Sequence, residues 1–216
     1  MNTLLEISSP LSFIELEKKE APMAGIPMHL PKSFDGKHKL LTMVLHDQSR
    51  LQEIYDLRLA VWENCGSIEF VNRTLFPTGW FDELDESAIH WVTINHQNKI
   101  VAAARLNVFH SLKESPYHTS ISHLGFPAES AFAFYSRLVV DPQYRNNGLS
   151  KQLYEQRTQF CSKKKIPWSQ VFINNPHVIK MFEAEGFKNT GKAQVSYHKS
   201  SLPHSVNVFV KKNKYH

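Results

Sequence analysis

The chain has little of what marks a secreted, metal-binding or membrane protein. Its two cysteines, Cys65 and Cys161, lie far apart and in no metal-like spacing, so we expect free thiols in a reducing cytoplasm. No apolar run is long enough to span a bilayer, so no membrane contact is expected. Residues 1–10 lack the basic and long apolar segments of a secretory signal, so we expect none. Twelve histidines are present, but their spacing fits no zinc site such as His-Glu-x-x-His, and we expect no metal.

The composition is that of a globular protein. With 216 residues, 42% of them hydrophobic and 21% charged, the chain can form one large domain around a substantial core. The net charge is +5, but much of it lies in the lysines at 163–165 and 211–214, the end of a predicted helix and a solvated terminus. Nucleic acid is therefore not the favoured partner, whereas a basic surface suits an anionic cofactor.

The first 38 residues differ from the rest. Residues 1–38 contain four prolines and show no sustained hydrophobic period, which is typical of an extended arm. We therefore predict an N-terminal arm over 1–38 and a single domain over 39–216.

Alternating helical and extended patterns follow the arm. The spacing predicts strands at 39–46, 90–96, 100–109, 131–140, 168–173, 195–197 and 206–210. Helices are expected from a capping box at Ser49-x-x-Gln52, over 149–164, and from Pro176 after an Asn175 cap. This mixture predicts an α/β mixed sheet, mostly antiparallel, with one parallel crossover from 131–140 to 168–173.

The stretch from Leu138 to Ser150 is the most informative. A buried strand ends at Asp141-Pro142, and a polar turn containing Gly148 leads into a helix. Free backbone N–H groups and the positive end of the helix dipole meet at such a turn, which suits a bound phosphate.

Two motifs in the chain resemble those of the GNAT (GCN5-related N-acetyltransferase) superfamily. Residues 138–150 are similar to its acyl-CoA signature, Leu-x-Val-x-Pro-x-Tyr-Arg-x-x-Gly-x-Ser, and residues 175–187 to Asn-x-x-Ala-x-x-x-Tyr-Glu-x-x-Gly-Phe. The resemblance covers about 39–212 and implies the GNAT fold with the strands splayed around acetyl-CoA or CoA as acyl donor. The cofactor-binding residues that it implies are Leu138, Val139, Val140, Arg145, Asn146, Asn147, Gly148, Leu149, Ser150, Asn175 and Phe182.

The sequence departs from that pattern at the residues that move protons. The tyrosine that often protonates the leaving thiolate is Phe182 here, and the strand position where some relatives carry a glutamate base is apolar, at or near Phe134. Substitutes are Tyr135 on the core strand and the acidic residues of 64–88, which is where the family plan puts a second helix and its loop over the acceptor. The acidic candidates are Glu69, Asp82, Glu83 and Asp85. We carry Tyr135 and Glu83 forward as catalytic candidates.

Two arginines interrupt apolar strands that should be neighbours. Arg105 and Arg137 need partners if they are buried. They could form structural ion pairs with Glu63 or Asp85, or they could bind a carboxylate or carbonyl of the substrate. This region, 104–106 with 135–138, also resembles acyl-homoserine-lactone synthases and N-acyl amino acid synthases, which share the fold and take acyl groups from an acyl carrier protein.

The sequence thus predicts an N-acyltransferase that moves an acyl group, most simply acetyl, from CoA to the amine of a small molecule or peptide. One alternative is an acyl-carrier-protein-dependent synthase. Another is a CoA-binding protein without catalysis. We expect a cytoplasmic protein, and a homodimer is left open.

Overall fold

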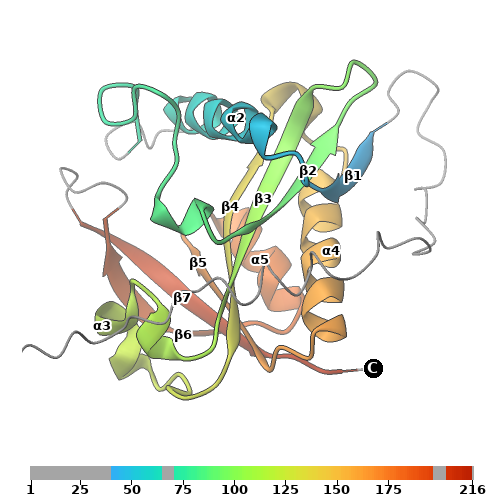
Figure 1. The fold of residues 1–216 in the computed structure, drawn as a ribbon. Coiled ribbons are helices and arrows are strands. Elements are labelled where there is room, and N and C mark those ends of the chain that lie inside the picture. The colour runs from blue at the N-terminus through green and yellow to red at the C-terminus, as the bar shows by residue number, and fades with distance from the viewer. Residues whose placement is uncertain (1–39, 65–70, 197–202, 216) are drawn as a thin grey trace, which may run out of the picture. The chain divides into compact units, whose positions relative to one another are not determined.

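The computed structural model describes residues 40–64, 71–196 and 203–215 (Figure 1). The predicted arm, Cys65 and Glu69 lie outside these residues. The strands are β1 (Leu41–Val44), β2 (Ile89–Ile94), β3 (Ile100–Phe109), β4 (Phe132–Val140), β5 (Trp168–Ile173), β6 (Lys188–Val195) and β7 (His204–Lys212). The α-helices are α2 (Leu51–Glu63), α3 (His118–Ile121), α4 (Leu149–Lys163) and α5 (Pro176–Ala184). The 3-10 turns are η1 (Gln48–Arg50), η2 (Glu83–Asp85), η3 (Leu112–Glu114), η4 (Ser122–Leu124) and η5 (Pro142–Tyr144).

The strands form a single seven-stranded sheet in the order β1-β2-β3-β4-β5-β7-β6. Every neighbouring pair is antiparallel except β4 and β5, which are parallel and joined through α4. The predicted mixed α/β sheet with one parallel crossover is therefore confirmed. The long apolar strands β3 and β4 lie at the centre, where both faces are buried, whereas the edge strands are the short β1 and the polar β6.

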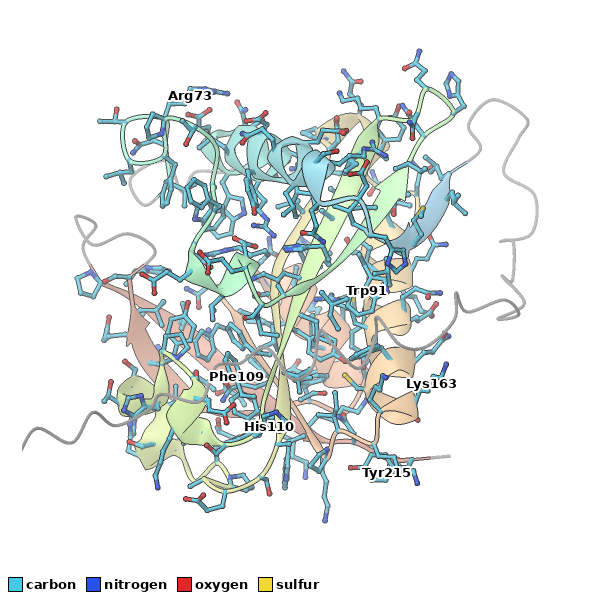
Figure 2. All side chains as sticks on the ribbon, in the orientation of Figure 1. Arg73, Trp91, Phe109, His110, Lys163 and Tyr215 are labelled. Atoms are coloured by element: carbon cyan, nitrogen blue, oxygen red, sulfur yellow. The ribbon has the colours of Figure 1, made fainter. Side chains whose placement is uncertain are left out.

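The helices cover opposite faces of the sheet. Ala102 and Ala104 of β3 pack in the cluster that contains Leu153 of α4, whereas the intervening Ala103 packs with Ile54 of α2. Successive strand residues point to opposite faces, so α2 and α4 lie on different sides (Figure 1). Trp91 of β2 points toward α4, where its ring lies 5.6 Å from that of Phe160 (Figure 2).

The helix ends follow local capping rules, with one difference from expectation. Asn175 caps α5 by accepting from the N–H groups of His177 and Val178, and Pro176 is the first helical residue, as predicted. The predicted capping box at Ser49 and Gln52 is wrong. The side chain of Asp47 accepts from the N–H of Ser49 and starts η1, which continues into α2 without a side-chain cap. The acid two residues upstream is the better acceptor for that N–H.

Two segments differ from their predictions in kind or extent. The penultimate strand spans 188–195 rather than 195–197, of which residue 197 lies outside the described residues. Only Ala193 and Val195 of β6 are buried, so this edge strand shows too little hydrophobic alternation to be recognised. Within 71–88 the chain forms turns and η2 instead of the second helix that the family plan implied.

Candidate functional site

The site begins where β4 and β5 part. Their parallel pairing runs from Phe132–Trp168 to Tyr135–Val171 and stops there, although β4 continues to Val140. Of the remaining β4 residues, Ser136, Val139 and Val140 pair with β3, and none of 136–140 pairs with β5. One edge of β4 therefore carries backbone groups that β5 does not use, and we call this divergence of the two strands the wedge.

A β-bulge lies at the apex of this wedge. The pairing of β3 and β4 shifts between Ala103 and Arg105, and Arg137 on the opposite strand has a φ of 53°. Such a φ is unusual for a residue other than glycine, and a bulge is a common place for it. The bulge turns the side chains of Ser136 and Arg137 to the face of the sheet that carries Asp82.

The loop at the other end of the wedge has the features of an anion site. Gly148 caps α4 with a φ of 72°, and Asn146 also has a positive φ of 65°. Among the described residues, the backbone N–H groups of Gly148, Leu149 and Ser150 donate no hydrogen bond to the protein. No heavy atom lies within 4 Å of the place where a Cβ on Gly148 would stand. Exposed N–H groups at a helix start fit a pyrophosphate, so these residues fit CoA.

The other predicted cofactor residues have varied surroundings. Leu138 and Val140 pack toward α4, and Val139 is buried on the opposite face, so their backbone rather than their side chains borders the wedge. The Asn175 side chain is engaged in capping α5. Phe182 is 2% exposed and packs with aromatic rings in the core. Asn147 donates to the carbonyls of Tyr144 and Arg145, which holds the loop's shape.

The two catalytic candidates lie in different surroundings. Tyr135 is 1% exposed, and its hydroxyl lies 3.4 Å from both Thr158 Oγ1 and Cys161 Sγ beneath α4. Burial raises the pKa of Tyr135 well above 10, so its phenol holds its proton tightly. Glu83 is exposed on η2, next to Asp82.

Asp82 joins the two arginines that the sequence singled out. Arg105 Nη1 lies 2.5 Å from Asp82 Oδ1 and 3.1 Å from Asp85 Oδ2, and Arg105 Nε donates to Ser136 Oγ at 2.9 Å. Arg137 pairs with the other oxygen of Asp82, and its guanidinium lies 3.9 Å from the centre of the Trp80 ring. Of the predicted acid partners, Asp85 is confirmed. Glu63 is wrong, because it pairs with Arg73.

A second layer extends this ion cluster into the core. Arg58 of α2 donates to both oxygens of Asp85, and His90 of β2 lies beside them, with each of these side chains no more than 2% exposed. The sequence gives one indication of this role for Arg58, because the arginine falls on the apolar face of its helix. Asp82 and Asp85 form a capping box around η2, which fixes both carboxylates toward the sheet.

The cluster sets the protonation states of its members. Burial alone would raise the pKa of Asp82, but Arg137 and Arg105 hold it far below its usual range. Burial would likewise raise the pKa of Asp85, but Arg58 and Arg105 hold it low. Burial, with Arg58 nearby, lowers the pKa of His90 to about 4, so the imidazole is neutral at pH 7. Three guanidinium groups against two carboxylates leave one net positive charge.

Sequence reasoning missed one aromatic residue beside this cluster. Tyr117, in the connection before α3, has its ring 5.5 Å from that of Phe134 and 5.1 Å from that of Phe172. Burial raises the pKa of Tyr117, while the nearby Arg137 acts to lower it, which puts this side chain within electrostatic reach of the cluster. No local pattern in the polar connection 110–130 points to it.

Comparison with known proteins agrees with this geometry. The profile of the acetyltransferase (GNAT) family matches residues 51–187, more than half of the chain, so the chain belongs to the GNAT family. Acetyl-CoA is the acyl donor that this family uses. No curated protein matches the sequence. No helix among the described residues is long and apolar enough to cross a membrane.

Several solved structures share the fold. A GNAT-family acetyltransferase from Staphylococcus aureus Mu50 aligns with a TM-score of 0.57 and 13% identity, over 82% of this chain and 100% of that one. FeeM, an N-acyl amino acid synthase from uncultured soil microbes, aligns with a TM-score of 0.61 and 12% identity, over 81% of this chain and 90% of that one. Arabidopsis thaliana NAA60, solved with acetyl-CoA, aligns with a TM-score of 0.56 and 13% identity, over 81% of this chain and 98% of that one. The GNAT resemblance that the sequence indicated is confirmed, and the FeeM alignment shows that this synthase shares the fold.

Proposed function

We propose that this protein transfers an acyl group from acyl-CoA to the amine of a small molecule. The observation that carries the proposal is the wedge between β4 and β5, which leads from the bulge at Arg137 to the loop at Gly148. Backbone groups of 138–140 would hold the pantetheine arm, and the N–H groups at the start of α4 would hold the pyrophosphate. This arrangement leaves the thioester near the bulge, facing the ion cluster.

The reaction needs few side chains. The amine nitrogen attacks the thioester carbon, the C–S bond breaks, its electron pair stays on sulfur, and the nitrogen loses a proton. A backbone N–H aimed at the carbonyl oxygen stabilises its developing charge by about 3 kcal/mol. Holding both reactants in place supplies much of the remaining rate enhancement.

We propose that Glu83, acting through water, takes the amine proton. Nearby arginines hold Asp82 and Asp85 ionised. The pKa values of these two carboxyl groups are therefore too low for an effective base. Tyr135 is enclosed beneath α4, which favours a role in core packing. Glu83 is the exposed carboxylate of the same turn and forms no ion pair among the described residues. A Glu83→Gln variant should lower kcat at least tenfold and leave the Kd for acetyl-CoA unchanged.

Arg105 and Arg137 would define the acceptor. The net positive charge of the cluster favours an acceptor that carries a carboxylate or carbonyl near its amine, as an amino acid does. Asp82 is 22% exposed, so it could also contact the amine directly. Amino acids should therefore be better acceptors than the matching amines that lack a carboxylate.

A second candidate is acyl transfer from an acyl carrier protein to an amino acid. The ion cluster favours it because it suits an amino acid carboxylate, and FeeM, which shares the fold, is an N-acyl amino acid synthase. Arg145 and the open loop at Gly148 favour CoA, whose pyrophosphate and adenosine an acyl carrier protein lacks.

Calorimetric titration with acetyl-CoA, followed by thiol release with a panel of amino acids and amines, tests the proposal. Binding with acceptor-dependent thiol release is expected. No binding at high micromolar acetyl-CoA would overturn the CoA assignment. Preference for acylated carrier protein would support the second candidate, and binding without thiol release would indicate a sensor.

A further inference from the structure

Arg157 of α4 is a buried cation that no carboxylate of residues 40–64, 71–196 and 203–215 balances. Its side chain points to the sheet and is 1% exposed. Nε donates to the Leu153 carbonyl at 3.0 Å and Nη1 to the Arg105 carbonyl at 3.3 Å, while Nη2 has no hydrogen-bond partner. Within the described parts of the chain, no carboxylate lies within 4 Å of this guanidinium.

An arrangement of this kind is costly in a resting protein. Burying a charge is strongly unfavourable unless an opposite charge or full hydrogen bonding offsets it. The other buried arginines, Arg58 and Arg105, both have aspartates. Among the described residues, Arg157 contacts two backbone carbonyls and the ring of Tyr135, whose centre is 4.7 Å from its Cζ. Among the described residues this charge therefore lacks an anion, and a ligand that develops negative charge nearby would supply one.

The position of Arg157 points to where that anion forms. Tyr135 is the last residue of β4 that pairs with β5, and Arg105 pairs with Ser136 at the bulge. The guanidinium thus lies directly behind the apex of the wedge, on the α4 side. Tyr154 and Phe182 pack beside Tyr135 and keep water out of this layer. In so apolar a layer a charge acts over a longer range than in water.

We propose that Arg157 stabilises the negative charge that develops on the CoA sulfur as the C–S bond breaks. It does not contact the ligand and acts across the β4 backbone. This role would offset the absence of a tyrosine hydroxyl at Phe182, because a thiolate stabilised by a fixed positive charge leaves without being protonated first. The inference rests on the proposed function.

The groups around Arg157 stay in one charge state over the useful pH range. Burial lowers the pKa of Arg157 to about 10 and raises the pKa of Tyr154 to about 12. Burial also raises the pKa values of Tyr135 and of the Cys161 thiol. Lys211 of β7 donates to the Tyr154 hydroxyl at 3.2 Å, and Arg105 presents its carbonyl while its side chain lies on the far face. Glu185, after α5, adds a negative charge near Tyr154.

The test compares the binding of CoA with that of acetyl-CoA. CoA has a thiol that can lose a proton, whereas the acylated sulfur of acetyl-CoA has none to lose. Calorimetric Kd values are measured at about pH 6.5 and about pH 9. If Arg157 lowers the pKa of the bound thiol by about one unit, CoA gains affinity relative to acetyl-CoA as the pH rises over this range, by at most about tenfold. Effects of pH on the phosphates and on the rest of the protein cancel in the ratio.

Variants separate this role from a structural one. Arg157→Met, which keeps length and loses charge, should abolish the gain and lower kcat for thiol release about tenfold, with the KM for acetyl-CoA unchanged. Arg157→Lys, which keeps the charge, should retain most of the pH-dependent gain and most of kcat. Arg73→Met, an exposed arginine paired with Glu63, is the matched control and should change neither. The melting temperature of Arg157→Met should not fall, since removing an unbalanced buried charge is often neutral or stabilising.

The outcomes are distinguishable. A wild-type protein that binds CoA and acetyl-CoA with the same pH dependence overturns the inference without any variant. So does an Arg157→Met protein that keeps the wild-type gain of CoA over acetyl-CoA. Failure of the wild-type protein to bind either compound overturns the proposed function and the inference with it.

Discussion

Replacing Gly148 with glutamate tests the phosphate loop most directly. Gly148 caps α4 in a left-handed conformation, and the space beside its Cα is open. A glutamate side chain would therefore fit, at a backbone cost of about 1–2 kcal/mol. In the free protein, its carboxylate at the positive end of the helix would offset part of that cost. The folded protein should consequently survive the change.

The Gly148→Glu change should destabilise the complex with acetyl-CoA much more than the free protein. The carboxylate would stand about 6 Å from a pyrophosphate with roughly two negative charges. At an effective dielectric constant of about 40, between the surface and bulk values, the repulsion is about 3 kcal/mol. That energy corresponds to roughly a hundredfold rise in the Kd for acetyl-CoA.

Calorimetric titration at about 50 mM and about 500 mM salt measures this effect. The loss should shrink at the higher concentration, because salt screens exposed charges. Gly148→Asn is the control, since asparagine tolerates positive φ and adds no charge, and its Kd should stay within about threefold of wild type. If the Gly148→Asn variant lost as much affinity as Gly148→Glu, backbone shape rather than charge would be responsible. Unchanged affinity in Gly148→Glu would refute the assignment of the loop.

Three further changes probe the ion cluster and the wedge. Asp82→Asn removes the anion between Arg105 and Arg137, so urea denaturation should show a loss of about 2–4 kcal/mol in unfolding free energy; a loss under about 0.5 kcal/mol would mean that the cluster contributes little. His90 stays neutral in the folded state down to about pH 4 while the unfolded chain binds a proton below about pH 6.5. The unfolded state therefore binds more protons in this window, and stability should fall by up to about 3 kcal/mol as the pH drops from 6.5 to 4, a slope that His90→Gln should flatten. Phe182→Tyr supplies a hydroxyl near the wedge, but kcat in a thiol-release assay should change little if Arg157 already stabilises the thiolate; a several-fold rise in kcat would show that thiolate protonation limits the rate.

Strand and loop boundaries at the centre of the sheet were predictable because local signals fix them. β3 and β5 begin and end where the sequence indicated, since each is an apolar run bounded by turn residues. The Asn175-Pro176 start of α5 and the turn at Gly148 follow from capping and backbone rules within a few residues. The bounds of β6 were wrong, 195–197 in place of 188–195, because an edge strand with one solvated face lacks that apolar run.

The sequence by itself determined the family, the mixed sheet with one parallel crossover and the loop that suits a phosphate. These depend on residues close together in the chain, whose spacing carries the information. Tertiary structure alone decided where β4 leaves β5 and that Asp82 pairs with Arg105 and Arg137, which are 23 and 55 residues away. It also decided that Tyr135 faces the core and that Arg157 lies behind the wedge, paired with no carboxylate of the described residues. Register and burial settle such pairings, because a charge takes whichever partner the packed sheet brings within reach.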